Sequence, residues 1–373
     1  MMKKTSVVAA VALAFASATA FGVPAFADGI RDKQWHLSYL KVLQAQRRST
    51  GKGVVVAVLD SGVSKHSDLS GSLLAGTDLV GSDGNGQDDV EGHGTAVAGL
   101  IAAHGKNGNG AWGIAPDAKI LPVRVFRTGD KSAELASGID YAVSQGAGVI
   151  NMSISVSATP ELLASVNKAT NAGVVLVAGV GNRPSSVSVT PPASLPGVLG
   201  VGAIGRSGEL GKISVTGKSV DIAAPGEDIE STYKRGDYLK NGNGTSYSSA
   251  IVAGAAALLR SKFPQMSAAD VVERLESTAV DKGAPGVDNE YGHGVLDIVA
   301  ALNGDGSATT EPSATAATPN TNPSSRTPVA AEPASSSKGS SSALFIGGVV
   351  LVVLLGGVVA FFALRSRKGQ ATR

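Results

Sequence analysis

The chain contains no cysteine and few aromatic side chains, and its charges nearly cancel. None of its 373 residues is cysteine, which excludes disulfides, thiolate nucleophiles and cysteine-based metal sites. A net charge of +2 gives no reason to expect nucleic acid as a partner. Aromatic residues make up only 4%, whereas glycine occurs 48 times, a composition typical of a sheet with many tight turns.

The amino-terminal end indicates export. Two lysines at positions 3 and 4 precede an apolar run from Val7 to Phe21. The sequence Ala25-Phe26-Ala27 then has the small-x-small pattern of a cleavage site. Residues 1–27 are therefore predicted to be a signal peptide.

The carboxyl-terminal end indicates attachment to a membrane. Residues 304–342 consist mainly of Ser, Thr, Pro and Ala and are predicted to form a disordered stalk. Residues 343–364 are apolar or Gly throughout, long enough for a helix that crosses the bilayer. The tail 365–373 is basic, which predicts a cytoplasmic C-terminus and a single-pass protein of the cell membrane whose folded part is extracytoplasmic.

Strand and helix patterns alternate between these ends, in residues 51–303. The run Val54–Leu59 is continuously apolar and β-branched, as expected for a central strand buried on both faces. Further strands are expected at 119–125, 149–153, 174–178, 198–203, 220–223 and 229–232, and helices at 92–104, 132–145, 161–172, 246–263, 267–278 and 295–302. This order predicts an α/β fold with a doubly wound, mostly parallel sheet flanked by helices.

The extension 28–50 lies between the predicted cleavage site and the first strand. It is too short to bury a core of its own. Its apolar residues include Trp35, Leu37 and Leu40, which we expect to pack on the outside of the folded domain 51–303. We therefore expect a fixed belt and not a separately folded pro-domain.

The strongest candidate for a nucleophile is Ser246. The sequence Gly244-Thr245-Ser246 leads into a run of small and apolar residues with helical spacing. A serine at such a helix start lies at the positive end of the helix dipole, beside backbone N–H groups without helical partners. That environment suits a reaction that passes through an oxyanion. An ordinary Ser-rich helix cap is the alternative.

Three further polar residues follow strands or open a helix. Asp60 ends the first strand, His93 stands between two glycines at a helix start, and Asn182 follows another buried strand. Each has a simpler explanation as a turn Asp, a surface His or a turn Asn. Catalytic groups of α/β sheets, however, gather at the carboxyl ends of strands. The chain order Asp, His, Ser is the order of the subtilisin triad.

The sequences around these residues resemble the subtilisin-like serine proteases. The resemblance rests on 58–63 (VLDSGV), 92–99 (GHGTAVAG), 244–246 (GTS) and 149–153 (VINMS). With the terminal segments and residues 30–37 (IRDKQWHL), the chain is most similar to the mycosins, membrane-anchored subtilases associated with type VII secretion. The resemblance implies a serine endopeptidase acting on polypeptides, with a membrane secretion complex as a possible partner.

The resemblance also implies roles for single residues. Ser246 would attack the peptide carbonyl, His93 would transfer the proton and Asp60 would orient His93. Asn182 would stabilise the oxyanion, and Ser153, Ile154 and Ser155 would line the substrate. Two departures concern specificity: Tyr247 stands where the family usually has Met, and Ser155 replaces a usual glycine.

No metal ion or other cofactor is expected. The acidic loop Asp83–Asp89 lacks the glycine and glutamate that a calcium loop requires, so a solvated loop is the preferred interpretation. The remaining histidines, at 36, 66, 104 and 293, show no ligand spacing. One alternative function stays open, a structural subunit that stabilises a secretion complex and whose triad is secondary or inert.

Overall fold

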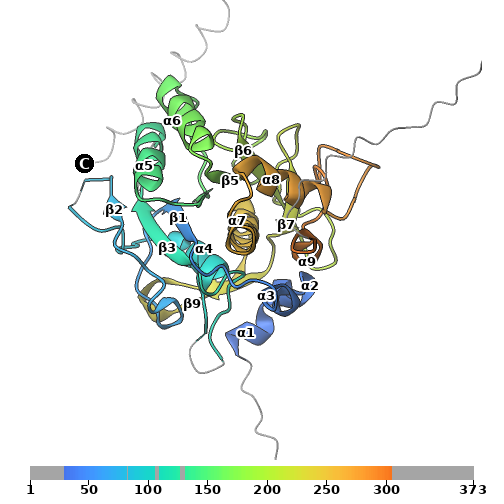
Figure 1. The fold of residues 1–373 in the computed structure, drawn as a ribbon, viewed down its shortest axis with the longest axis horizontal. Coiled ribbons are helices and arrows are strands. Elements are labelled where there is room, and N and C mark those ends of the chain that lie inside the picture. The colour runs from blue at the N-terminus through green and yellow to red at the C-terminus, as the bar shows by residue number, and fades with distance from the viewer. Residues whose placement is uncertain (1–28, 82, 106–108, 127–130, 305–373) are drawn as a thin grey trace, which may run out of the picture. The chain divides into compact units, whose positions relative to one another are not determined.

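A seven-stranded parallel sheet forms the centre of the folded region (Figure 1). The structure is a computed structural model, and it describes residues 29–81, 83–105, 109–126 and 131–304. The predicted signal peptide, the predicted stalk apart from residue 304, and the predicted transmembrane helix and basic tail lie outside these residues. Within the described ranges, no helix is both long enough and apolar enough to cross a membrane.

The strand order is β2-β3-β1-β4-β5-β6-β7, and every pairing is parallel. The strands are β1 (Val55–Asp60), β2 (Thr77–Asp78), β3 (Lys119–Arg124), β4 (Val149–Met152), β5 (Val175–Gly179), β6 (Val198–Ile204) and β7 (Ile222–Pro225). The chain leaves β1 toward β3 on one side and later returns to β4 on the other. In open α/β sheets, ligands bind at such a reversal, beyond the carboxyl ends of the strands.

Helices cover both faces of the sheet, as the sequence pattern predicts. They are α4 (His93–Ala102), α5 (Ser132–Ser144), α6 (Pro160–Asn171), α7 (Thr245–Lys262), α8 (Ala268–Ser277) and α9 (Ile298–Ala301). In β1, Val56 and Val58 belong to the core shared with α4 and α7, whereas Ala57 and Leu59 belong to the core shared with α5 and α6. This two-residue alternation between two apolar cores explains the continuous apolar run of the strand.

Three details differ from the sequence expectations, and the first is β2, a short strand of the sheet that the sequence pattern did not predict. The strand β8 (Ile229–Thr232) pairs antiparallel with β9 (Tyr238–Gly242), a strand that the sequence pattern did not predict. Helix α9 is shorter than the expected 295–302, because the backbone N–H and C=O of Val295 are hydrogen-bonded to Val280. The helix begins only after Asp297, whose carboxylate accepts a hydrogen bond from the backbone N–H of Ala300.

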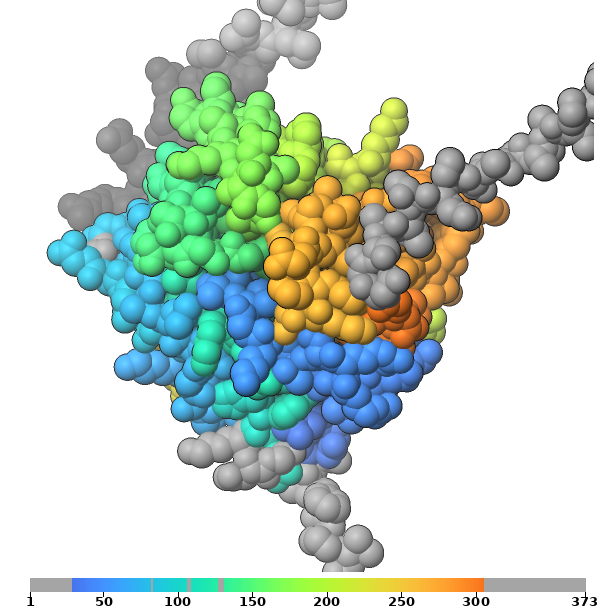
Figure 2. All heavy atoms as spheres, viewed as in Figure 1, coloured from blue at the N-terminus to red at the C-terminus, as the bar shows by residue number. Residues whose placement is uncertain are grey.

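The amino-terminal segment 29–48 packs on the domain as three short helices, α1 (Ile30–Lys33), α2 (Trp35–Tyr39) and α3 (Val42–Gln46). Leu40 is buried, and Trp35 and Leu37 pack partly buried against the core, so the expected belt is confirmed. The Trp35 indole donates to the carbonyl of Glu227, 3.0 Å away. In Figure 2 the blue segment lies on the surface beside the orange residues of the carboxyl-terminal helices, in agreement with the contacts between α3 and α9.

Candidate active site

The predicted site residues lie at the carboxyl ends of adjacent strands or at helix starts. Asp60 is the last residue of β1, and Asn182 follows β5 by three residues. His93 opens α4, and Ser246 is the second residue of α7. Since β1, β4 and β5 are neighbours in the sheet, their parallel order brings these ends together.

Asp60 and His93 form a direct pair. Nδ1 of His93 lies 2.8 Å and 3.0 Å from the two carboxylate oxygens of Asp60. The Asp60 side chain is only 1% exposed, and that of His93 is 29% exposed. Burial alone lowers the pKa of His93, but the Asp60 carboxylate, together with Asp89 and Glu91, outweighs this effect and raises the pKa above its ordinary value.

Asp89 organises the start of the histidine helix, a role that the sequence did not reveal. Its carboxylate accepts hydrogen bonds from the backbone N–H groups of Glu91, Gly92 and Thr95 and from the hydroxyls of Ser61 and Thr95. The side chain is buried, so the interpretation of a solvated acidic loop is wrong for this residue. Only its position four residues before His93 could have drawn attention to it.

Ser246 lies in the first turn of α7, a helix that is buried on all sides from Tyr247 to Leu259. Backbone N–H groups in a first turn have no partner within the helix. The Ser246 hydroxyl makes no hydrogen bond to His93 within the described residues. The ring of Tyr247, the residue after Ser246, has its centroid 5.9 Å from that of His93. Catalytic hydrogen bonds are often long in structures without substrate.

Asn182 is fixed next to Ser246. Its Oδ1 accepts hydrogen bonds from the backbone N–H of Thr245 at 2.9 Å and from the Thr245 hydroxyl at 3.2 Å. Because a backbone N–H can only donate, the amide oxygen must face Thr245, and the Nδ2 group then points away from it. A donor is therefore held beside the first turn of α7.

The predicted substrate-lining residues differ in their surroundings. The Ser153 hydroxyl donates to the Ser246 carbonyl at 3.1 Å and contacts the Ser249 hydroxyl, so Ser153 lies against the backbone of the nucleophile candidate. Ile154 packs partly buried against the core on the α5 and α6 side, and Ser155 is exposed.

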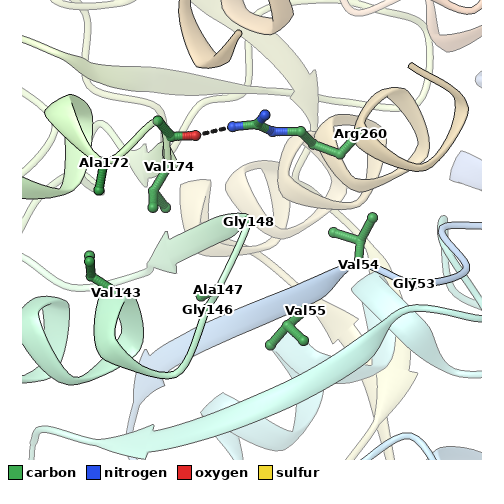
Figure 3. A pocket seen from close by; sticks show the side chains of 11 residues that line it. Gly53, Val54, Val55, Val143, Gly146, Ala147, Gly148, Ala172, Val174 and Arg260 are labelled. Carbon is green, nitrogen blue, oxygen red and sulfur yellow. Dashed lines mark hydrogen bonds between the residues drawn. The ribbon is translucent and has the colours of Figure 1, made fainter. Parts of the chain in front are cut away.

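A separate pocket of about 300 Å³ lies at the other end of the strands, where β1, β4 and β5 begin (Figure 3). It is lined by the residues that precede β1, β4 and β5, among them Gly53, Gly148 and Val174, and by Arg260. The guanidinium of Arg260 donates to the Gly173 carbonyl. None of the predicted site residues lines this pocket.

No group of three or more His, Asp or Glu side chains in the described part of the chain could hold a metal ion. The site offers acid–base and nucleophilic groups: a carboxylate bound to a histidine, a serine at a helix start and an amide donor next to it. A doubly wound parallel sheet with the order Asp, His, Ser along the chain is the arrangement of the subtilisin-like serine proteases.

The chain belongs to the subtilase family (Peptidase S8), which it matches over residues 51–294. It is 38% identical over 271 residues to Subtilisin BL from Lederbergia lenta. The aligned region covers 72% of this chain and 97% of that protein. It is 37% identical over 273 residues to Minor extracellular protease Epr from Bacillus subtilis (strain 168). This aligned region covers 72% of this chain but only 41% of that protein.

Among solved structures the chain is similar to MycP1, a mycosin. The crystal structure of MycP1 from Mycobacterium smegmatis has a TM-score of 0.68 and 31% identity, and covers 79% of this chain and 91% of that one. A second MycP1 structure, described as a serine protease and an essential component of the type VII (ESX-1) secretion system, has a TM-score of 0.66 and 33% identity. It covers 74% of this chain and 89% of that one.

Proposed function

We propose that this serine protease is a membrane-anchored, extracytoplasmic endopeptidase that uses Asp60, His93 and Ser246 as its triad. The observation that carries the proposal is the pair of short contacts between His93 Nδ1 and both carboxylate oxygens of Asp60. A carboxylate bound at Nδ1 fixes the tautomer that leaves Nε2 free to accept a proton.

In the proposed mechanism, Nε2 of His93 takes the proton of the Ser246 hydroxyl while Oγ of Ser246 attacks the peptide carbonyl. The Asp60 carboxylate stabilises the imidazolium that forms. The Nδ2 group of Asn182 and the backbone N–H of Ser246 donate to the oxyanion. His93 then passes its proton to the leaving amine, and water repeats the sequence on the acyl-enzyme.

A fluorophosphonate probe tests this mechanism directly. It should label the full-length chain and the matched variant Ser249→Ala, but not Ser246→Ala. Ser249 is a suitable control because it lies on the same helix, three residues further on, and its hydroxyl donates to the Ser246 carbonyl. Equal labelling of Ser246→Ala would contradict the assignment of the nucleophile.

The membrane anchor is proposed from the sequence alone. The apolar segment 343–364 and the basic tail 365–373 support an anchor with a cytoplasmic C-terminus. A reporter fused after Arg373 should be cytoplasmic, and external protease should release a soluble fragment by cutting within 304–342. A reporter on the outer side would contradict this orientation.

A role in type VII secretion is proposed from the similarity to MycP1, one structure of which is described as an essential component of such a system. That description also favours a second candidate function, a structural subunit of a membrane complex. Comparing the secreted proteins of wild type, Ser246→Ala and a full deletion separates the two. Processing requires the Ser246 variant to resemble the deletion, whereas a structural subunit requires it to resemble wild type.

A further inference from the structure

Tyr247 follows the nucleophile candidate in the chain, and its ring lies close to that of the histidine. It directly follows Ser246 and is 8% exposed. Its ring centroid lies 5.9 Å from that of His93, with an angle of 40° between the two planes. The ring also lies near Gly242 and Gly244, where a β-carbon on Gly242 would come within 2.8 Å of Tyr247 Cε2. The side chain is therefore held against His93 by the backbone that leads into α7.

Tyr233 supports the segment that carries His93. Its hydroxyl donates to the carbonyl of Glu91 at 2.7 Å. A β-carbon on Gly92 would lie 2.4 Å from a ring atom of Tyr233, so the ring is in direct contact with the residue before His93. Tyr233 thus supports the backbone that leads to His93, while the ring of Tyr247 lies close to the imidazole itself.

The charged and titratable groups that face His93 come from several elements. Asp60 comes from β1, Asp89 and Glu91 come from the loop before α4, and Tyr247 comes from α7. An aromatic ring attracts a cation that lies over its face within about 6 Å of the centroid, and this attraction disappears when the cation loses its charge. Burial, with smaller contributions from Asp60 and Tyr233, raises the pKa of Tyr247 to about 12, so its ring stays neutral at ordinary pH.

We propose that Tyr247 is a positioning residue for His93. The phenol ring of Tyr247 holds the imidazole of His93 in place and favours the protonated form of the imidazole. The inference rests on the proposed function, because the protonated form is the one that passes a proton to the leaving amine. An interaction that is stronger with imidazolium than with imidazole stabilises the transition state more than the ground state.

The test compares Tyr247→Met with Tyr247→Phe in the full-length chain. Phe keeps the aromatic face, whereas Met fills similar space without it. We expect Tyr247→Met to lower the pKa of His93, measured by NMR titration, by about 0.4 to 0.7, and kcat by about two- to fivefold with KM nearly unchanged. The acidic limb of the pH profile should move to lower pH, and Tyr247→Phe should match wild type in all three measurements.

Tyr238→Met is the matched control, because Tyr238 packs against a different histidine, His66, with ring centroids 5.1 Å apart. It should leave the titration of His93 unchanged. The inference is overturned if Tyr247→Met leaves the pKa of His93 unchanged, or if Tyr247→Phe is as impaired as Tyr247→Met. The titration needs no turnover, so a failure of the inference is distinguishable from a failure of the proposed function, which the fluorophosphonate probe decides.

Discussion

The side-chain oxygen of Asn182 accepts a hydrogen bond from the backbone N–H of Thr245, the residue directly before Ser246. The two residues are 63 positions apart in the sequence. This contact orients the amide, because its oxygen is occupied by Thr245 and its nitrogen must face the other way. The position of the proposed oxyanion donor is thus fixed by the same turn that presents the serine.

Replacing Asn182 with Ala should reduce kcat by about 10²–10³ and leave KM nearly unchanged, because the oxyanion exists only in the transition state. Steady-state kinetics on a peptide substrate measures both constants. Thermal unfolding should accompany them, since Asn182→Ala also removes the acceptor for Thr245. A large rise in KM instead would assign Asn182 to substrate binding.

Ser246→Ala and His93→Ala should each reduce peptidase activity by several orders of magnitude. The double variant should be little worse than either single variant, because the two groups act as a unit. Single-turnover and steady-state rates of the three variants provide the test. Losses that multiply would show that the side chains act independently.

The pH profile should reflect the raised pKa of His93. Only neutral imidazole accepts the serine proton, so kcat/KM should fall as the pH drops through a pKa above the ordinary value of 6.5. Because Asp60 is the main cause of the increase, Asp60→Asn should move the acidic limb to lower pH and also reduce kcat. An acidic limb of wild type clearly below pH 6.5 would contradict the electrostatics of the site.

His36 should make the free energy of unfolding depend on pH in the acidic range. It is completely buried, neither ring nitrogen has a hydrogen-bond partner within the described residues, and burial lowers its pKa from 6.5 to about 3. Below pH 6.5 the unfolded chain binds a proton that the folded protein does not. The free energy of unfolding should therefore fall by about 1.4 kcal/mol per pH unit between pH 6.5 and about 3 from this group alone.

Denaturant unfolding of wild type and His36→Leu across this range measures the contribution of His36. The variant should gain stability relative to wild type as the pH falls, and the difference should level off below about pH 3. His104→Leu is a matched control. Unlike His36, His104 has a hydrogen-bond partner, because its Nε2 bonds the carbonyl of Ser70. A difference that does not vary with pH would refute the prediction.

Asp89→Asn should impair the site without touching the reacting groups. The buried carboxylate accepts three backbone N–H groups at the start of α4 and contributes to the raised pKa of His93. An amide oxygen replaces only part of these contacts, so we expect a loss of about 1–3 kcal/mol in unfolding free energy and a lower pKa of His93. Unchanged stability and an unchanged pH profile would show that the carboxylate is dispensable.

Much of the fold was predictable from local patterns. The strand β1 and the helix α7 have compositions that admit few alternatives: an apolar run rich in valine, and small residues at helical spacing after a Gly-Thr turn. Asp60, His93 and Ser246 were recognisable because each stands in a short glycine-flanked sequence next to such an element. Periodicity and turn chemistry act over a few residues, so the sequence alone contains them.

The tertiary structure decided what depends on distant partners. The contact of Asn182 with Thr245 and the hydrogen bond from the Ser61 hydroxyl to Asp89 each join segments whose proximity no local pattern encodes. The same holds for Val295, which hydrogen-bonds Val280 where the sequence favoured a helix. A carboxylate in a polar loop is solvated or buried according to which groups the fold brings around it, and for Asp89 the fold adds the hydroxyl of Ser61, which follows β1, to the nearby N–H groups at the start of α4.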